Sequence, residues 1–259
     1  SPQNVFSEVQ QIVSDYPSVT EIFFEIESIV LNEPFALELC RLLEPFRAGR
    51  DRTLSFGAIM RVVPNVQAEK IFAAFSRSGI GFINIGLESG SERVRRDILK
   101  RNYTNDEVIQ VVETARRHGL RVCFYNLIGL PGETVEDFKK TIAINRRCLP
   151  DWYFLSIFFP YPGTDLYAKC LREGLLSRPL DTNMERTRAA LEYPSFSRRQ
   201  IQHYFTWFDY YVHHGHKPLW KILARMFVAL IKSRHRLNVW YRRLTGSGIL
   251  FRLKEVVRR

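Results

Sequence analysis

The sequence has little cysteine and no arrangement of it that binds a metal. Four cysteines stand among 259 residues, and no two of them are closer than 22 residues. Thiolates that share a metal ion are usually separated by roughly two to four residues. The sequence therefore predicts no metal site of its own. Isolated, widely spaced cysteines are typical of a reduced, cytosolic protein.

Long apolar runs and targeting signals are also missing. No uncharged apolar stretch approaches the roughly 18 residues of a membrane-spanning helix. Residues 1–11 are polar and do not form a secretory signal. With 46% hydrophobic and 13% aromatic residues, the chain can bury a core, which excludes disorder. We expect a folded cytoplasmic protein.

The net charge of +11 is confined to the C-terminal part of the chain. From Arg198 onward there are 14 basic and 2 acidic residues, so the rest of the chain is nearly neutral. This basic C-terminal region could neutralise phosphates. Its basic positions alternate with apolar ones, however, instead of forming a compact basic and aromatic platform. Nucleic acid is therefore not the expected partner.

The sequence motifs of the common hydrolytic sites are absent as well. His118 is the only histidine before residue 200, and it is expected to end a helix. There is no Gly-x-Ser-x-Gly elbow and no phosphate-binding Walker loop. Glu25 and Glu27 would point the same way from one strand, and a solvent-facing or helix-capping role for them stays open. The sequence gives little support to a hydrolase.

Short apolar runs do alternate with segments of helical period between residues 1 and 164. The runs are rich in β-branched, aromatic and aliphatic residues, as strands buried on both faces are. We expect strands at 20–27, 54–61, 81–88, 121–129 and 152–160, and helices at 35–46, 66–78, 91–99, 105–118 and 134–148. Such alternation forces a parallel sheet with right-handed crossovers, either open or closed into a barrel.

Three of these helices are expected to begin with a capping box, in which two side chains satisfy orphan N–H groups. The pairs are Ser89 with Glu92, Thr104 with Glu107, and Thr134 with Asp137.

The character of the sequence changes after Gly163. One more helix is expected at 164–172, an irregular stretch at 173–194, and helix throughout from Ser197. Within 219–232, apolar residues at 219, 222, 223, 226, 227 and 230 form an amphipathic stripe, and Lys217, Lys221 and Arg225 share the opposite side. We expect this helix to dock either onto the barrel or onto an anionic membrane surface. The predicted domains are 1–176 and a linker with a basic helical tail, 177–259.

Ligands of such α/β folds bind at the carboxyl ends of the strands. The residues there include one carboxylate, Glu88, a small-residue turn at 89–91, and two Pro-Gly loops at 129–134 and 160–164. This set predicts a rim lined by backbone and oxygen atoms rather than a nucleophile with its base.

Four ordered segments resemble the radical S-adenosylmethionine (SAM) superfamily. They are INIGLESGS at 83–91, LKRNYT at 99–104, NLIGLPGET at 126–134 and FPYPGT at 159–164. Within it the chain is most similar to enzymes with an N-terminal cobalamin-binding domain, of the anaerobic magnesium-protoporphyrin ester cyclase type. The resemblance covers roughly residues 1–176. It implies an α/β fold, a partial TIM-like (β/α) barrel of parallel strands followed by a C-terminal helical region.

In that superfamily a four-iron four-sulfur cluster, held by a CxxxCxxC loop after the first strand, reductively cleaves SAM. This sequence contains no CxxxCxxC. Residues 1–5 resemble the segment after the cluster loop, so the five expected strands would be strands two to six, with the first strand and the cluster ligands upstream. The chain alone is then expected to be inactive. A cluster-less SAM-binding module or an inactive relative is the alternative.

The resemblance also implies cofactors and partners for the intact enzyme. The cofactors are SAM, the iron–sulfur cluster with ligands outside this chain, and cobalamin through a further N-terminal domain. The partners are a small-molecule substrate of unknown identity and an external electron donor. The basic tail adds a membrane surface as a partner, which would make the protein cytoplasmic and peripheral to the membrane.

Eight residues are implied as SAM contacts. Glu88 would accept hydrogen bonds from ribose hydroxyls or from the methionine amino group, and Arg101 would pair with the methionine carboxylate. A helix-terminus carboxylate and an exposed arginine are the respective alternatives. The remaining implied contacts are Ser89, Tyr125, Asn126, Ile157, Phe158 and Phe159. A buried polar pair for Tyr125 and Asn126, and core packing for the aromatic residues, stay open.

Overall fold

The computed structural model describes residues 1–26, 29–49, 54–64, 66–176, 180 and 185–233 of the chain. The chain forms two compact units, Ser1–Arg198 and Arg199–Arg259, each considered separately below. The predicted domain boundary after residue 176 stays a prediction.

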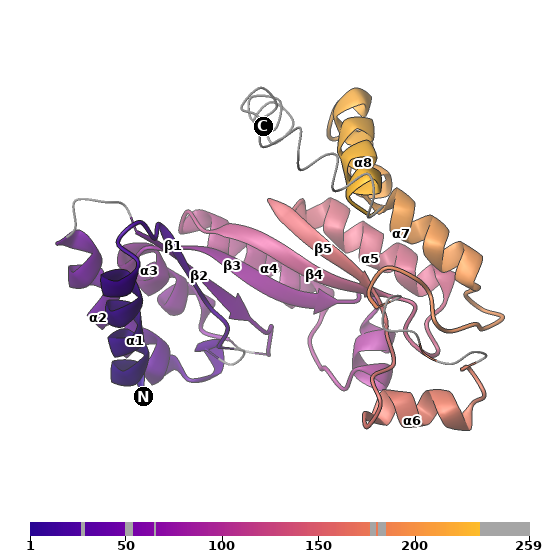
Figure 1. Cartoon of the computed structure of the whole chain (residues 1–259), viewed down its shortest axis with the longest axis horizontal. Helices are drawn as coiled ribbons and strands as arrows, with labels where there is room; N and C mark the ends of the chain where they lie inside the picture. The colour runs from indigo at the N-terminus through magenta and orange to yellow at the C-terminus, as the bar shows by residue number, and fades with distance from the viewer. Residues whose placement is uncertain (27–28, 50–53, 65, 177–179, 181–184, 234–259) are drawn as a thin grey trace. The chain divides into compact units, whose positions relative to one another are not determined.

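The first unit is built on five parallel strands whose spatial order is their sequence order. They are β1 (Glu21–Phe24), β2 (Ser55–Met60), β3 (Ile80–Glu88), β4 (Arg121–Ile128) and β5 (Trp152–Ile157) (Figure 1). Each strand pairs in parallel with its neighbours. The predicted partial barrel of parallel strands is confirmed.

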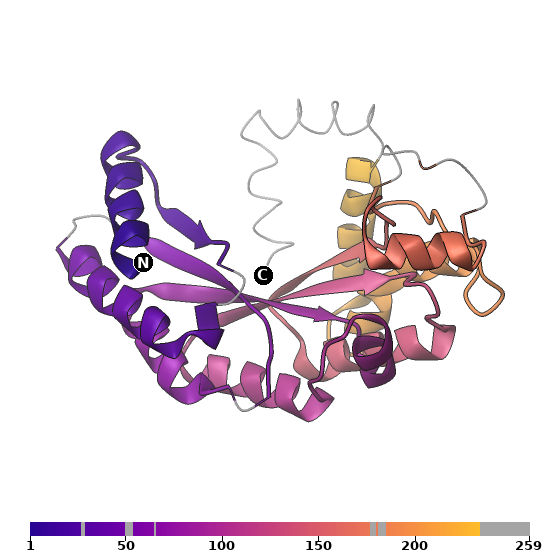
Figure 2. The same ribbon diagram turned by 90° about the horizontal axis from the view of Figure 1, so that it is seen from below.

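Helices cover the convex side of this sheet, as Figure 2 shows for the purple to magenta helices. The helices of the unit are α1 (Pro2–Asp15), α2 (Glu33–Ala48), α3 (Ala68–Ser78), α4 (Asn105–Arg117), α5 (Val135–Cys148) and α6 (Asp165–Arg172), with short turns η1 (Ile29–Leu31) and η2 (Val94–Ile98). The core lies between strands and helices. Fully buried members include Leu39, Leu43, Phe56, Phe72, Phe75, Ile83, Val108 and Phe124.

Aromatic side chains of β1, β3 and β5 cover part of the concave face, near the beginnings of β3 and β5. Phe23 and Phe82 stack at 5.8 Å across Gly57, and Phe82 meets Trp152 edge-on at 5.5 Å. A Cβ at Gly57 would lie 2.0 Å from the Phe82 ring, so only glycine fits beneath it. The Arg121 guanidinium lies 5.6 and 5.4 Å from the Phe82 and Trp152 rings. These side chains leave the carboxyl ends of the strands as the place where ligands of such folds bind.

Of two local predictions around residue 91, the helix is confirmed in part and the capping box is wrong. The segment expected to be helical at 91–99 is helical from residue 92 to residue 98, and Val94–Ile98 form a π-helical turn, η2. The expected box of Ser89 and Glu92 does not form, because Glu92 Oε1 accepts from the Asn105 N–H at 2.7 Å. Ser89 Oγ instead accepts from the Ser91 N–H at 3.2 Å. The boxes at Thr104 with Glu107 and at Thr134 with Asp137 are confirmed.

The second unit contains α7 (Arg198–His213) and α8 (Leu219–Ser233) in its described part. The prediction of helix throughout from Ser197 is wrong, because residues 214–218 form a turn. Gly215 adopts φ +84 there, and Pro218 lacks the N–H that a continuing helix needs. No helix among the described residues is long and apolar enough to cross a membrane. Glu27, the side chains of residues 230 and 232, and the tail from 234 lie outside the described residues.

Candidate functional site

The site begins at the end of β3, where the backbone leaves regular strand geometry. The register between β3 and β4 shifts between Gly86 and Glu88. Glu88 adopts φ +57, a left-handed conformation that costs a non-glycine residue roughly 1–2 kcal/mol. Bulges beside active sites commonly redirect a side chain.

Glu88 and Arg101, 13 residues apart in the sequence, come together at this point. Arg101 Nη1 lies 3.3 Å from Glu88 Oε1, and the two side chains are 20% and 17% exposed. The pair lies over Gly86, since a Cβ there would be 2.8 Å from Glu88 Oε1 and 3.3 Å from Arg101 Nη1. The two residues named first for the methionine end of SAM therefore form one partly buried ion pair at the carboxyl end of β3.

A buried arginine and a tyrosine, the Arg95–Tyr103 clamp, hold this loop to the strand. Arg95 is fully buried and donates to the carbonyls of Ser89, at 2.6 Å, and Tyr103, at 2.9 Å. The guanidinium stacks on the Tyr103 ring at 4.6 Å. The Tyr103 hydroxyl lies 3.0 and 3.1 Å from the carbonyl oxygens of Gly86 and Leu87. The clamp thus connects residues 89–103 to the bulge that carries Glu88.

Arg95 also fixes the backbone of Arg101. The Arg101 N–H donates to the Arg95 carbonyl at 2.8 Å. Burial lowers the pKa of Arg95, but an arginine stays charged at neutral pH. Sequence reasoning missed the clamp, because an arginine beside other basic residues in a polar segment resembles a solvated surface residue.

A second network fixes the other end of the loop to α5. Ser91 Oγ donates to Asp137 Oδ1 at 2.6 Å, and Arg93 pairs with the other carboxylate oxygen. Burial opposes ionisation of Asp137, but hydrogen bonds from Arg93, Ser91 and Thr134 outweigh it and lower its pKa to about 2. The carboxylate stays ionised at neutral pH and holds the turn after β3 in place.

The loop after β4 is shaped by a buried carboxyl group that the sequence reasoning did not single out. Glu133 Oε2 accepts from the N–H groups of Gly129, at 2.7 Å, and Leu130, at 3.2 Å. Burial raises the pKa of Glu133 to about 8, so the group is largely protonated at neutral pH. The Tyr193 hydroxyl donates to the Gly129 carbonyl. This Pro-Gly loop therefore has a fixed shape, as the rim interpretation requires.

A polar and aromatic row lies on the concave face beside Gly86. Tyr125 is the register partner of both Gly86 and Phe154. Its hydroxyl accepts from Asn84 Nδ2 at 2.7 Å, and its ring lies 5.5 Å from Phe154, which is 55% exposed. Asn84 Oδ1 is buried with no hydrogen-bond partner in the part of the chain that the structure describes. The row offers an apolar face and polar atoms to a ligand.

Two of the implied contacts lie on the helix side of the sheet. Asn126 follows Tyr125 on β4 and so points the opposite way. Its amide bonds to Asn145 on α5, whose Nδ2 donates to Asn126 Oδ1 at 2.8 Å. Ser89 Oγ is 3.4 Å from Thr141 Oγ1, also on α5. Their side chains serve the barrel wall in this structure, and a SAM contact by either residue stays a prediction.

The last three implied SAM contacts, residues 157–159, lie at and after the end of β5. Ile157 is buried and pairs with Ile128. Phe158 is half-buried and packs against the small cluster around Val94, Ile98 and Leu130. Phe159 is buried and meets Tyr161 edge-on at 5.2 Å. These contacts agree with core packing, the alternative given above, and contact with SAM stays a prediction.

An iron–sulfur cluster does not fit the cysteines of this chain. Cys40, Cys123, Cys148 and Cys170 are all buried, on α2, β4, α5 and α6 respectively. Burial raises the pKa of each thiol, to about 12 for Cys123 and about 11 for the others, whereas cluster ligands are thiolates. Among the described residues, no three histidine, cysteine or acidic side chains come close enough to hold a metal ion.

Comparison with known proteins gives one family for most of the barrel. Residues 2–143 match the Radical SAM superfamily. An uncharacterized methyltransferase of Pyrococcus horikoshii is 29% identical over 176 residues, which are 68% of this chain and 37% of the relative. The anaerobic magnesium-protoporphyrin IX monomethyl ester cyclase of Rubrivivax gelatinosus is 22% identical over 65% of this chain and 29% of the cyclase. The chain therefore spans about a third of the length of these relatives.

A solved structure agrees with this fold. The radical SAM methyltransferase TsrM of Kitasatospora setae, with cobalamin and a [4Fe-4S] cluster bound, matches with a TM-score of 0.56. It is 17% identical, and the match covers 70% of this chain and 35% of TsrM. At this identity the likeness shows a shared fold.

Proposed function

The chain belongs to the radical SAM superfamily, and on that premise we propose that its Glu88–Arg101 pair binds the methionine end of SAM. The observation that carries the proposal is the position of the pair. It lies over a glycine at the carboxyl end of β3, the end of the sheet where ligands of such folds bind. The bulge and the clamp hold both residues there.

The charges of the pair match those of the ligand. The methionine part of SAM carries an ammonium and a carboxylate. When it binds, the ammonium can take the place of Arg101 beside Glu88, and the carboxylate can take the place of Glu88 beside Arg101. Each protein charge keeps a partner in both states, so neither state leaves a partly buried charge unpaired.

The chain's own residues then orient SAM and its reaction partner. SAM supplies the adenosyl or methyl group that reactions of this superfamily use. We place the substrate, a small molecule, along the row of Tyr125 and Phe154, which begins beside Gly86. Asn84 and the Tyr125 hydroxyl provide polar atoms along that row. Leu127 and Phe158 pack with the Leu130 cluster at the ends of β4 and β5 and give this end of the site an apolar wall.

The other components that the reaction needs would be supplied by parts of the protein, or by partners, other than the described residues. The cluster ligands would be supplied by other residues of the intact enzyme, because the four cysteines do not fit the cluster. Cobalamin would come with a further domain, and an external donor would supply electrons. We propose a cytoplasmic enzyme. The relatives described above include a methyltransferase and a cyclase, and SAM binding by this pair suits either reaction type.

Gly86→Ala tests the site without removing either charge. The new Cβ would displace the flexible ends of Glu88 and Arg101, so we expect SAM affinity to fall about 10-fold or more with little loss of stability. Isothermal titration with SAM measures the affinity, and thermal unfolding measures the stability. Gly49→Ala is the control for affinity, because Gly49 lies at the end of α2 with φ −79, and a Cβ there would make only an ordinary contact, 3.6 Å from the Pro45 carbonyl oxygen. Unchanged SAM affinity in a folded Gly86→Ala variant would contradict the proposal.

The second candidate is a SAM-binding module without a cluster, which is favoured by the burial of all four cysteines. The two candidates make the same prediction for this chain, and they differ in whether the intact protein holds a cluster. Iron analysis and SAM titration of the full-length protein distinguish them: stoichiometric iron with SAM binding supports the enzyme, and SAM binding without iron supports the module.

A further inference from the structure

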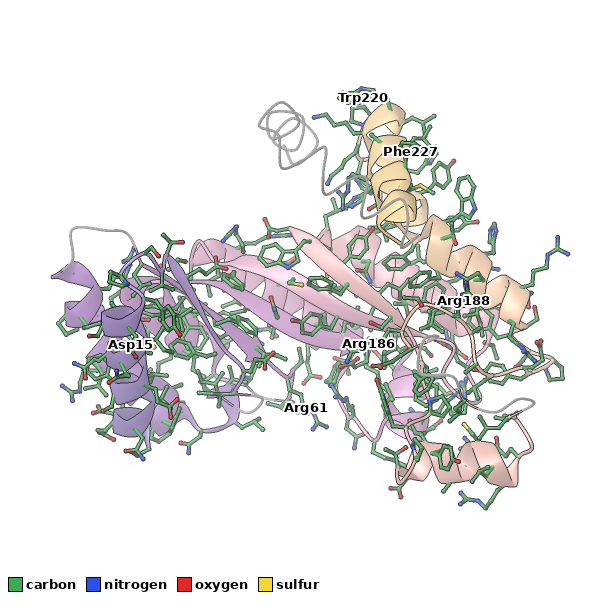
Figure 3. All side chains as sticks on the ribbon, in the orientation of Figure 1. Asp15, Arg61, Arg186, Arg188, Trp220 and Phe227 are labelled. Atoms are coloured by element: carbon green, nitrogen blue, oxygen red, sulfur yellow. The ribbon has the colours of Figure 1, made fainter. Side chains whose placement is uncertain are left out.

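Over residues 219–227, whose side chains the structure describes, helix α8 exposes four large apolar side chains on one face. Leu219, Trp220, Leu223 and Phe227 are 52%, 57%, 45% and 63% exposed. Successive residues of an α-helix are about 100° apart, so these four fall within an arc of roughly 100°. Figure 3 shows Trp220 and Phe227 standing out from α8. We call these four residues the α8 apolar face.

Side chains on the other side of α8 are buried or pair with α7 within the second unit. Ile222 is buried, and Arg225 Nη2 lies 3.1 Å from Asp209 Oδ1 on α7. The single apolar stripe expected from the sequence is thus divided, because Ile222 is buried while Leu219 and Leu223 are exposed. The α8 apolar face is therefore additional to the apolar surface that α8 uses for packing.

Helix α7 of the same unit also carries aromatic side chains that are at least partly exposed. Tyr204, Trp207, Tyr210 and Tyr211 form a chain of ring contacts with His203, at centroid distances of 5.5 to 6.3 Å. Trp207 is 39% exposed, and the tyrosines are half-buried. Rings with one polar atom are the side chains that concentrate where water meets hydrocarbon.

The charge of the unit selects the partner. Residues 199–259 contain 13 basic and 2 acidic residues. The Lys221 ammonium lies 5.5 Å from the Trp220 ring, beside the α8 apolar face. A second copy of this unit would bring the same positive charge and be repelled, whereas an anionic surface is attracted. Apolar and aromatic residues on one face with lysine and arginine beside them are the composition of helices that lie in a membrane interface.

We propose that the second unit binds an anionic phospholipid membrane, with α8 lying in the headgroup region and its apolar face in contact with the acyl chains. Attraction by the basic residues brings the unit to the surface, and insertion of Trp220 and Phe227 holds it there. The binding is peripheral and reversible, so it weakens as salt screens the charges.

Flotation with vesicles tests the proposal on the full chain. The vesicles are phosphatidylcholine alone and phosphatidylcholine mixed with phosphatidylglycerol, each at low and high salt. We expect association with the mixed vesicles only, and loss of association at high salt. Replacing Leu223 and Phe227 together by Ser should lower partitioning at least about 10-fold. Lys221→Glu should lower it less, because one basic residue of many is changed.

A matched variant controls for loss of exposed apolar surface in general. Leu31 and Leu171 are 52% and 54% exposed in the first unit, and their joint replacement by Ser should leave partitioning unchanged. Circular dichroism checks that each variant is folded.

Three results would overturn the proposal. The first is absence of association with the mixed vesicles. The second is equal association of the Leu223 and Phe227 variant and the control variant. The third is a stable dimer in sedimentation that the Leu223 and Phe227 variant dissociates while vesicle binding is absent, which would make a second copy the occupant of this face.

Discussion

Glu88 carries two unusual features in one residue, a left-handed backbone and a partly buried charge. The backbone conformation directs its carboxylate over Gly86, where it meets Arg101. Neither feature alone would mark a site, since left-handed residues and ion pairs both occur in ordinary loops. Together with a clamp that has no other evident purpose than to hold this loop, they indicate a residue that is positioned for a ligand.

Arg101→Ala should weaken SAM binding about 10- to 150-fold. Losing a charge-assisted hydrogen bond of this kind costs roughly 1.5–3 kcal/mol. Arg101→Lys should recover only part of the affinity, because an ammonium cannot reproduce the planar fork of the guanidinium. Isothermal titration with SAM measures both variants in the intact enzyme.

The control for this prediction is Arg96→Ala. Arg96 lies in the same loop, is 62% exposed and pairs with Asp97, so its loss removes a similar charge outside the site. If Arg96→Ala and Arg101→Ala lower SAM affinity equally, the loss reflects charge alone, and the role given to Arg101 is wrong.

Glu133 should make the stability of the fold depend on pH. The unfolded chain releases this proton near pH 4.5, whereas burial raises the pKa of the folded group to about 8. Between these values the folded state binds more protons, so the free energy of unfolding falls as the pH rises. Glu133→Gln keeps an acceptor for Gly129 and Leu130 and should flatten this slope. Urea unfolding at roughly pH 5 and pH 8 measures it.

Glu136→Gln is the matched control for Glu133. Glu136 lies three residues later, in the first turn of α5, with a side chain that is 73% exposed. It should leave the slope of the native chain unchanged. A slope that Glu133→Gln does not alter would show that other groups cause it.

At the scale of the element, the loop between β3 and α4 depends on the Arg95–Tyr103 clamp. Tyr103→Phe removes the hydroxyl that the Gly86 and Leu87 carbonyls contact, and should lower the free energy of unfolding by about 1–2 kcal/mol. Arg95→Met leaves the buried Ser89 and Tyr103 carbonyls without donors, and should cost more, roughly 2–5 kcal/mol. Denaturant unfolding measures both changes.

Tyr16→Phe serves as the control, because Tyr16 is 65% exposed. If it lowers stability as much as Tyr103→Phe does, the clamp hydroxyl contributes nothing specific.

The strands could be predicted closely, and the turns between them less well. Parallel strands buried on both faces are apolar throughout, so β2 to β4 lie within about a residue of the predicted runs, while the run predicted for β5 extends past Ile157 into the following loop. The π-helical turn η2 could not be predicted, since the spacing of Val94 and Ile98 suits a regular helix equally well. The turn before α8 could have been predicted, because Gly215 and Pro218 are ordinary signals for the end of a helix.

The same contrast holds for the site. The family resemblance, not the residue pattern, brought Glu88 and Arg101 together as a prediction, and the structure places them 3.3 Å apart. Arg95 and Asn84 could not be found in this way, because each depends on contacts with residues far along the chain. The same resemblance implied Asn126 and Ser89, but which side of the sheet a residue faces depends on the register, which the composition does not reveal.

At the scale of the whole molecule, this chain should not cleave SAM reductively by itself. Its four cysteines are buried on four different elements and cannot supply three clustered thiolates. Anaerobic reconstitution with iron and sulfide, followed by reduction in the presence of SAM, measures this directly. Release of 5′-deoxyadenosine with a stoichiometric four-iron cluster would prove the expectation wrong.

The order of the strands has a consequence for how the chain is made. Because β1 to β5 lie side by side in the order of the sequence, each strand leaving the ribosome finds its partner already synthesised. No strand has to wait for a later one, as it would in a sheet whose neighbours are distant in sequence. When α5 has emerged, β1 to β4 and both Glu88 and Arg101 are outside the ribosome. The ion pair is therefore expected to form during translation, before β5 leaves the ribosome.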